Sequence, residues 1–343
     1  MKPNFFEIAT DEVTQDGFIA WLLQWVNKDN EKHELYQCAV EFVKFLIREF
    51  LEMEKKIDEA KSLANLEIIS VETDRQRENI DVWAKIDDKY LIIIEDKTFT
   101  SEHDNQLEEY KKYAKDWCKK EKKNRELICI YLKTGTDSNY FINEIINKKF
   151  KYKYINRSDL IKFFENKTYS GIKNDIYNDF FKKIKNLDLA EKAFDGKKIQ
   201  EWDDNCWMGF GAYMDSCLTE IKDLKKQITR VIINWKDYSW NEQAKENIFL
   251  QIDSKKDFAL CFKIKDELEK NINTQVAEDF RNKLRENKNE KIIIRKSSGK
   301  EFMTVAIVEK ENWLKKEKGG TIDKEETIKE LKKYEEILKK CIL

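Results

Sequence analysis

The stretch NIDVWAKIDDKYLIIIEDKTF, residues 79–99, decides the fold of this chain. Its two apolar runs flank a turn signal, Asp-Asp-Lys at 87–89, so we expect two antiparallel strands at 79–86 and 89–99. The second strand passes through four aliphatic residues directly into Glu95-Asp96-Lys97. A buried strand that ends on three charges places them either in solvent or at the edge of a site.

The alternation of side chains along a strand separates these three charges. Glu95 and Lys97 point to one face of the sheet, and Asp96 points to the other. If the Asp-Asp-Lys segment forms a three-residue loop, the numbers of paired residues add up to 176, and Asp81 lies opposite Glu95. A tight two-residue turn would instead place Ile94 opposite Asp81. In the first register, two carboxylates and one ammonium form a small patch.

Two carboxylates on neighbouring strands repel each other unless a cation lies between them. Hard oxygen ligands suit Mg²⁺ or Mn²⁺, and a site with few protein ligands leaves positions for water and a phosphate oxygen. We therefore predict a divalent-metal site held by Asp81 and Glu95, with the backbone carbonyl of Asp96 as a further ligand. Lys97 would position or deprotonate the attacking water, or stabilise the charge of the transition state.

The segments around this hairpin alternate between helical and extended patterns. We expect helices at 14–26, 34–60, 103–121 and about 172–186, and strands at 65–73 and 125–135. A short strand and a helix capped by Ser158 are expected within 151–166. This order of elements predicts an α/β fold with a mixed sheet flanked by helices.

A lysine-rich connector at 187–201 suggests two domains, 1–190 and 200–343. For the second we expect another α/β unit, with helices at 204–228, 271–287 and 323–342, and strands at 247–254, 258–265, 291–296 and 303–310. We identify no catalytic motif in it. We expect it to contribute specificity, sensing, or a homodimer or protein-partner interface.

Composition excludes several classes of protein. No apolar run approaches the roughly 18 residues of a membrane span, so we expect a soluble, cytoplasmic protein without membrane contact. The seven cysteines are never spaced as Cys-x-x-Cys, which disfavours a disulfide framework, a zinc ribbon and an iron–sulfur cluster.

The charges are distributed unevenly along the chain. Residues 1–110 carry 13 Lys and Arg against 26 Asp and Glu, whereas residues 111–200 carry 23 against 12. The basic segment is either a solvated surface or a phosphate-binding face.

Asp81, followed by Glu95-x-Lys97 at the end of an apolar strand, resembles the PD-(D/E)xK nuclease superfamily. In the next predicted helix, Gln106 and Tyr110 resemble the Gln-x-x-x-Tyr signature of its RecB-like branch, and their i, i+4 spacing puts them on one helix face. The resemblance covers about residues 5–165. It extends to poorly characterised bacterial members, several of which are suspected of roles in defence.

The resemblance implies a restriction-endonuclease-like fold. In it, Asp81 and Glu95 bind the metal ion and Lys97 assists the water. Gln106 and Tyr110 orient the site or the substrate. The resemblance also implies a further acidic ligand, for which the candidates are Glu12, Asp16, Glu41 and Glu72. The name-giving proline of the motif is absent, a departure that leaves the aspartate in place.

An acid-x-Lys pattern alone is not specific in so charged a chain, because Asp87-x-Lys89 also matches it. The prediction therefore rests on the joint occurrence of the hairpin, the aspartate and the helical pair. We expect a Mg²⁺- or Mn²⁺-dependent nuclease that hydrolyses phosphodiester bonds, a DNA endonuclease in a bacterial defence or restriction setting. The alternatives are an RNA-directed nuclease and a catalytically silent nucleic-acid- or protein-binding module on the same fold.

Overall fold

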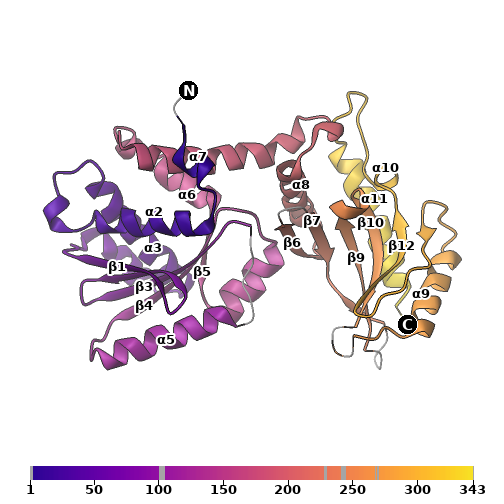
Figure 1. The fold of residues 1–343 in the computed structure, drawn as a ribbon, viewed down its shortest axis with the longest axis horizontal. Helices are drawn as coiled ribbons and strands as arrows, with labels where there is room; N and C mark the ends of the chain where they lie inside the picture. The colour runs from indigo at the N-terminus through magenta and orange to yellow at the C-terminus, as the bar shows by residue number, and fades with distance from the viewer. Residues whose placement is uncertain are drawn as a thin grey trace. The chain divides into compact units, whose positions relative to one another are not determined.

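The computed structural model describes residues 3–99, 105–227, 230–240, 245–266, 268 and 270–342. The chain divides into two compact units (Figure 1). The first comprises residues 1–136 and 142–189, and the second comprises 137–141 and 190–343. Within the described part of the chain, no helix has the length and apolar character needed to cross a membrane.

A five-stranded mixed sheet of order β1-β2-β3-β4-β5 forms the centre of the first unit. Its strands are β1 (Val71–Arg77), β2 (Ile80–Ile86), β3 (Tyr90–Lys97), β4 (Glu126–Lys133) and β5 (Lys153–Asn156). The first three run antiparallel, whereas β3, β4 and β5 run parallel. Residues 91–94 are fully buried, as expected for a strand covered on both faces. The mixed α/β fold predicted from the sequence is confirmed.

Helices cover both faces of this sheet. In Figure 1, α2 (Glu12–Gln24) and α3 (Tyr36–Met53) lie on one face and α5 (Gln106–Lys120) lies along the other. The remaining helices are α1 (Phe5–Ile8), α4 (Ile57–Ser62), a π-helix (Phe141–Phe150), α6 (Arg157–Phe164) and α7 (Asp175–Lys192). Single 3₁₀ turns occur at Lys28–Asn30, Leu63–Asn65 and Lys167–Tyr169.

The β2–β3 hairpin has the three-residue loop. Its pairs run from Val82–Ile94 to Ile86–Tyr90, and the residue numbers of every pair add up to 176. This register is confirmed, and the two-residue turn is wrong. One residue further along, the same register brings Asp81 beside the end of β3, where its carboxylate accepts a hydrogen bond from the N–H of Asp96 at 2.9 Å.

The first strand differs from its prediction at 65–73, because β1 begins only at Val71 and continues to Arg77. Most of β1 is polar, so its own apolar pattern does not reveal it. Pairing with β2 defines it instead. The two strands are joined by a tight turn at Glu78 and Asn79, and both residues have the positive φ that a type I′ hairpin turn requires.

Two helix boundaries were also predicted wrongly. The helix expected at 34–60 is interrupted, because α3 ends at Met53 and Lys55 adopts a left-handed φ of 62° before α4. The N-cap of α6 is Asn156 and not Ser158. The Asn156 side chain accepts from the N–H of Asp159, whose carboxylate accepts in return, so two free backbone donors are satisfied at once. Of the helix predicted at 103–121, residues 103 and 104 lie outside the described residues.

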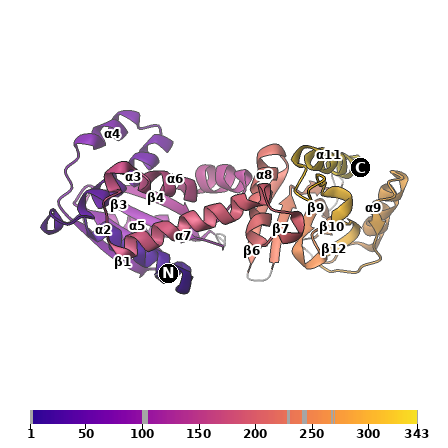
Figure 2. The same ribbon diagram turned by 90° about the horizontal axis from the view of Figure 1, so that it is seen from above.

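The second unit contains an antiparallel sheet of order β11-β12-β10-β9-β7-β6, to which β8 is added beside β9. Its strands are β6 (Ile221–Gln227), β7 (Arg230–Trp235), β8 (Tyr238–Ser239), β9 (Asn247–Asp253), β10 (Ala259–Lys265), β11 (Ile293–Ile294) and β12 (Phe302–Val308). Its helices are α8 (Asp204–Cys217), α9 (Thr274–Glu286), α10 (Lys310–Trp313) and α11 (Lys324–Lys340), with 3₁₀ turns at Ala193–Asp195, Ile199–Glu201 and Ser254–Lys256. Figure 2 shows α11 lying along the sheet.

The helix predicted at 204–228 is wrong beyond Cys217. Residues 221–227 form β6, which pairs with β7 in a hairpin. The segment Lys-Asp-Leu-Lys-Lys-Gln has ordinary helix propensities, but pairing in the sheet overrides them.

One core holds the second unit together. It contains side chains of α8, α9, α10 and α11 and one face of the sheet, including Trp202, Trp207, Trp235 and Trp240. The tryptophans are therefore packing residues. All seven cysteines of the chain are free, and all except Cys217 are buried.

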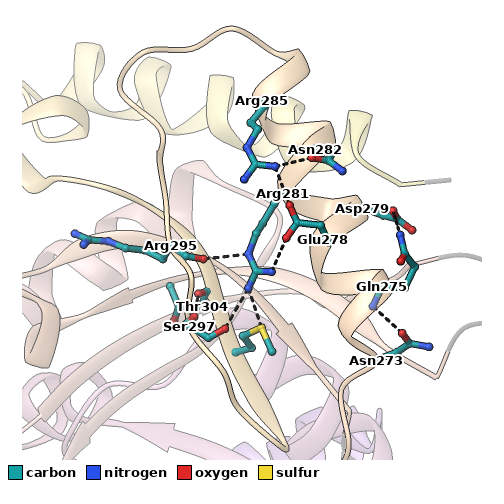
Figure 3. Close-up of polar contacts among 11 residues, drawn as sticks. Asn273, Gln275, Glu278, Asp279, Arg281, Asn282, Arg285, Arg295, Ser297 and Thr304 are labelled. Carbon is teal, nitrogen blue, oxygen red and sulfur yellow. Dashed lines mark hydrogen bonds and ion pairs between the residues drawn. The ribbon is translucent and has the colours of Figure 1, made fainter.

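A buried arginine of α9 holds the segment between β11 and β12 (Figure 3). Arg281 donates from Nε to the carbonyl of Arg295 at 3.0 Å and from Nη2 to the carbonyl of Ser297 at 3.1 Å. Its Nη1 forms an ion pair with Glu278 at 3.1 Å. Because the guanidinium is planar and rigid, these contacts fix the position of the segment around Arg295 and Ser297, which leads into β12.

Candidate metal centre

The end of the β2–β3 hairpin gathers three charged side chains on one face of the first sheet. The Lys97 ammonium forms ion pairs with Glu95 and, at 3.6 Å, with Asp81. The Glu95 side chain is fully buried and the other two nearly so. Strand alternation puts Glu95 and Lys97 on one face, and the hairpin register adds Asp81. The structure thus brings together the three residues that the sequence placed in one site.

Asp96 points to the opposite face, toward α2. Nε2 of Gln15 donates to its Oδ1 at 2.5 Å, and Oε1 of Gln15 accepts from Oγ1 of Thr134 at 3.1 Å. Burial, reinforced by the Asp16 carboxylate, raises the pKa of Asp96 well above its usual range. Sequence reasoning missed Gln15, although a glutamine inside a helix that is apolar on nearly every side is a signal.

Two of the four candidate acids lie beside this centre. Oε1 of Glu12 accepts from the N–H of Thr98 at 2.6 Å, at the end of β3. Burial, followed by the nearby Asp81 carboxylate, raises the pKa of Asp16 to about 7. Both residues belong to α2, the helix that packs against β1, β2 and β3. The packing of α2 therefore supplies additional carboxylates to the same end of the sheet.

The other two candidate acids have partners elsewhere. Glu41 interacts within its own helix, with Gln37 at 3.5 Å and Lys44 at 3.6 Å. Glu72 is exposed on β1 and forms an ion pair with Lys85 of β2. Among the interactions of the described residues, neither acid contacts the metal-centre side chains.

Two residues near the centre had no signal in the sequence. Nε2 of Gln76 donates to Asp81 at 3.0 Å and to Asp16 at 3.3 Å, so this amide connects the two acids. Lys183 of α7 lies near Asp96 and Glu12. Burial lowers the pKa of Lys183, and these two carboxylates oppose that lowering. Both are polar residues in polar segments, and only tertiary packing distinguishes them.

Glu95 of the centre holds its proton unusually tightly. Burial, followed by the repulsion of Asp81, raises the pKa of Glu95 to about 8. Burial lowers the pKa of Lys97, but the carboxylates of Glu95 and Asp81 outweigh it and raise the net value above that of an ordinary lysine. Lys97 is therefore a protonated counter-ion in a cluster where carboxyl groups are in excess.

An unsatisfied oxygen at this centre fits a divalent cation. Among the described residues, Oε2 of Glu95 is buried without a hydrogen-bond partner, an unfavourable state for a carboxylate. Within the same residues, no three His, Cys, Asp or Glu side chains form a complete metal-ligand set. Two side-chain ligands completed by a carbonyl and water suit Mg²⁺, which keeps several waters.

The helical glutamine and tyrosine face the centre from α5. Nε2 of Gln106 donates to the hydroxyl of Tyr110, which lies on the same helix face. Burial raises the pKa of Tyr110, and the carboxylates of Glu95 and Asp81 raise it further. The phenol is thus within the electrostatic influence of the metal centre, on the face to which Glu95 and Lys97 point.

Comparison with known protein families gives one result for this chain. A family model described as the PD-(D/E)XK nuclease superfamily matches residues 3–209, more than half of the chain. No curated protein and no solved structure gives a significant match. The matched range includes every residue of the metal centre described above and extends beyond the 5–165 covered by the resemblance in the sequence.

Proposed function

The chain belongs to the PD-(D/E)XK nuclease superfamily, whose members are phosphodiester-cleaving nucleases that generally use divalent metal ions, and we propose that it is a Mg²⁺- or Mn²⁺-dependent DNA endonuclease. The observation that carries the proposal is the buried pair of Asp81 and Glu95, with Lys97 as their common counter-ion. A binding module has no need of this arrangement, which is unfavourable in the absence of a ligand.

Asp81 and Glu95 would hold the metal ion, with the backbone carbonyl of Asp96 as the third protein ligand. The bound ion supplies Lewis-acid polarisation of the phosphate and lowers the pKa of a coordinated water. Gln76 would hold the Asp81 carboxylate in one orientation through its 3.0 Å hydrogen bond, as outer partners of metal ligands commonly do.

Asp16 is the additional acid that we favour. Its carboxylate shares the Gln76 amide with Asp81, at 3.3 and 3.0 Å, whereas Oε1 of Glu12 already accepts from two backbone N–H groups, those of Thr98 and Phe99. Glu12 would accordingly stabilise the end of β3, and Asp16 would add negative charge beside Asp81.

Lys97 would act as a cation and not as a base in the resting centre. Its raised pKa keeps the ammonium protonated, so it would orient the attacking water and stabilise the charge that develops on the phosphoryl oxygens. Gln106 and Tyr110 would hold the substrate or the site from α5. These are hydrogen-bonding roles, for which their mutual contact prepares them.

We extend the proposal to a cytoplasmic enzyme in a bacterial defence or restriction setting, as the family resemblance implies. The second unit would provide specificity, sensing, or a homodimer or protein-partner interface. Its sheet, helices and core form a compact unit of their own, which suits a role separate from cleavage.

A cleavage assay tests the proposal. Supercoiled, linear and single-stranded DNA and RNA are incubated with Mg²⁺ or Mn²⁺, and with EDTA. We expect DNA cleavage that requires the metal and falls about 10²- to 10³-fold in Lys97→Met, because the phosphate loses its cation. Lys85→Met is the matched control, since Lys85 also pairs with a glutamate of this sheet but away from the centre.

Three outcomes would contradict parts of the proposal. Cleavage by Lys97→Met at the wild-type rate would remove the assigned mechanism, and activity that persists in EDTA would remove the metal. Cleavage of RNA alone would keep the enzyme class and overturn the DNA assignment.

A further inference from the structure

The second unit contains a cavity of about 500 Å³ against its sheet, apart from the metal centre. Five cationic side chains contribute to its lining: Lys222, Lys225, Arg230, Lys263 and Lys265. They come from three strands, β6, β7 and β10. The aromatic rings of Phe249 and Phe302 also line the cavity. Two acidic side chains, Asp223 and Asp237, also contribute, so positive charge is in excess in the lining, although the chain as a whole carries a net charge of −1.

Strand alternation explains why most of these cations share one face, and an irregularity in the pairing of β6 between Ile221 and Asp223 accounts for Lys222. Along β10, Leu260, Phe262 and Ile264 belong to the core formed with the helices, and the intervening residues, Lys263 and Lys265, line the cavity. The same alternation holds along β7 and β9. A sheet with one solvated face normally shows exposed polar side chains there. Lys263 and Lys265 are instead only 8% and 5% exposed.

Most of the cavity's cations have a carboxylate partner. Arg230 makes a bidentate contact with Asp253, at 2.9 and 2.6 Å. Lys225 contacts Asp223 at 2.7 Å. Lys222 and Lys265 both contact Asp237, each at 2.7 Å. These ion pairs offset the repulsion among the neighbouring cations. Lys263 is the one cation of the lining that has no such pair among the described residues.

Lys263 forms no ion pair within the described residues. Its ammonium donates to Oε1 of Gln251 at 2.9 Å and lies 5.6 Å from the ring centroids of both Phe249 and Phe302. Burial lowers the pKa of Lys263, and the neighbouring Lys256 lowers it further. The nearby Asp253 carboxylate opposes this lowering, but it is already paired with Arg230. A buried ammonium that forms no ion pair is unfavourable, so an anionic ligand in the cavity would supply the missing partner.

We propose that this cavity binds a free nucleotide, with its phosphate on Lys263 and the neighbouring cations and its base against Phe302. Lysine and arginine are the side chains that recognise phosphate. Phe302 is 46% exposed where β12 begins, so its ring is open to stacking, which every base supports. The volume lies in the range of small-molecule sites and suits a ligand of nucleotide size.

The burial of Lys263 and Lys265 favours a free nucleotide over a nucleic-acid strand. Strand-binding surfaces place their cations along a groove that follows the backbone. Here Lys263 lines a cavity of about 500 Å³, is only 8% exposed and is held by Gln251. A small ligand can enter such a cavity with its phosphate first, whereas an internal phosphate of a strand is flanked by sugars on both sides.

Isothermal titration calorimetry on the full chain in EDTA tests the proposal, because EDTA keeps metal ions out of the nuclease centre. The probes are ATP, GTP, AMP, pyrophosphate, adenosine and a single-stranded oligonucleotide without terminal phosphates. We expect at least one nucleotide to bind and adenosine not to bind. In Lys263→Met the nucleotide should bind about tenfold more weakly or worse, since a charged hydrogen bond to phosphate is lost.

Lys315→Met is the matched control. Lys315 is another lysine of the second unit whose pKa is lowered by burial, and it lies outside the cavity, so its replacement should leave nucleotide binding unchanged. Lys222→Gln provides a second cavity variant; its side chain is 39% exposed, so the fold should tolerate the change. Circular dichroism verifies the folding of each variant.

Several results would overturn the proposal. These are the absence of binding by every nucleotide, equal affinity in wild type and both cavity variants, and equal weakening in the Lys315→Met control. Binding of pyrophosphate but of no nucleotide would reassign the cavity to phosphate alone. Binding of the oligonucleotide but of no free nucleotide would reassign it to the path of a nucleic-acid strand.

Discussion

In the first unit, the Lys97 ammonium forms ion pairs with two carboxylates, those of Glu95 and Asp81, whereas in the second unit the buried ammonium of Lys263 forms no ion pair with a carboxylate of the described residues. An uncompensated buried charge is unfavourable wherever it lies. Such a charge is a candidate functional group, because a ligand of opposite sign removes the penalty. The same physical rule therefore points to a cation in one unit and an anion in the other.

The two clusters also differ in how they are built. The metal centre takes Asp81, Glu95 and Lys97 from one hairpin, and α2 adds further acids. The basic cavity collects its side chains from five strands and from the segment after β7. A compact motif in the sequence encodes the first cluster, whereas sheet assembly creates the second.

The largest expected effect comes from Glu95→Gln, which removes one of the excess carboxylates without changing its shape. We expect cleavage to fall on the order of 10³-fold, because a metal ligand and its charge are lost. The metal-free protein should nevertheless melt at a higher temperature than wild type, since an unfavourable buried acid is gone. Cleavage assays and thermal melts in EDTA measure the two effects.

Glu72→Gln is the control for this change, because Glu72 is an exposed carboxylate of the same sheet; it should alter neither quantity measurably. If Glu95→Gln instead lowered the melting temperature of the metal-free protein, the first unit would not contain an uncompensated excess of acid, and the comparison would fail.

An effect of intermediate size is the pH dependence of stability that the buried acids of the first unit should produce. The pKa of Glu95 is about 8 in the folded chain, against an ordinary 4.5, so the folded state retains a proton that the unfolded state releases. The stability of the metal-free protein should therefore fall as pH rises from about 4.5 to about 8, by up to about 1.4 kcal/mol per pH unit for each proton. Asp16, with a pKa of about 7, adds to the same trend.

Denaturant unfolding at several pH values, with EDTA or with Mg²⁺, measures this effect. Mg²⁺ should stabilise the protein more at pH 8 than at pH 6, because metal binding must displace these protons. Glu95→Gln should reduce the slope. A Mg²⁺ effect that is independent of pH would show that these carboxyl groups do not hold the metal.

The smallest expected effect concerns Gln76, the amide between Asp16 and Asp81. Gln76→Leu should weaken Mg²⁺ binding about tenfold, because outer hydrogen-bond partners orient metal ligands. Gln24→Leu is the matched control, since Gln24 makes a comparable bond to Thr73, 2.6 Å long, between α2 and β1 but outside the centre. Equal Mg²⁺ affinity in both variants, measured by calorimetry, would restrict the centre to the hairpin.

Much of the first unit could be predicted because its determinants are local. Alternation assigned Glu95 and Lys97 to one face, and a loop length assigned the register. Errors arose where pairing or packing overrides local pattern. The polar strand β1 exists because β2 pairs with it, and β6 forms in a segment with ordinary helix propensities because β7 lies beside it.

The sequence by itself determined the α/β class, the hairpin and the juxtaposition of Asp81, Glu95 and Lys97, since these depend on strand period and a short loop. Only the tertiary structure decided that Asp16 and Gln76 join this centre while Glu41 does not, because the packing of α2 brings in Asp16 and the pairing of β1 brings in Gln76, 60 positions away from it. It alone also revealed the basic cavity. Its cations come from separate strands, and no local pattern records which strands become neighbours in a sheet.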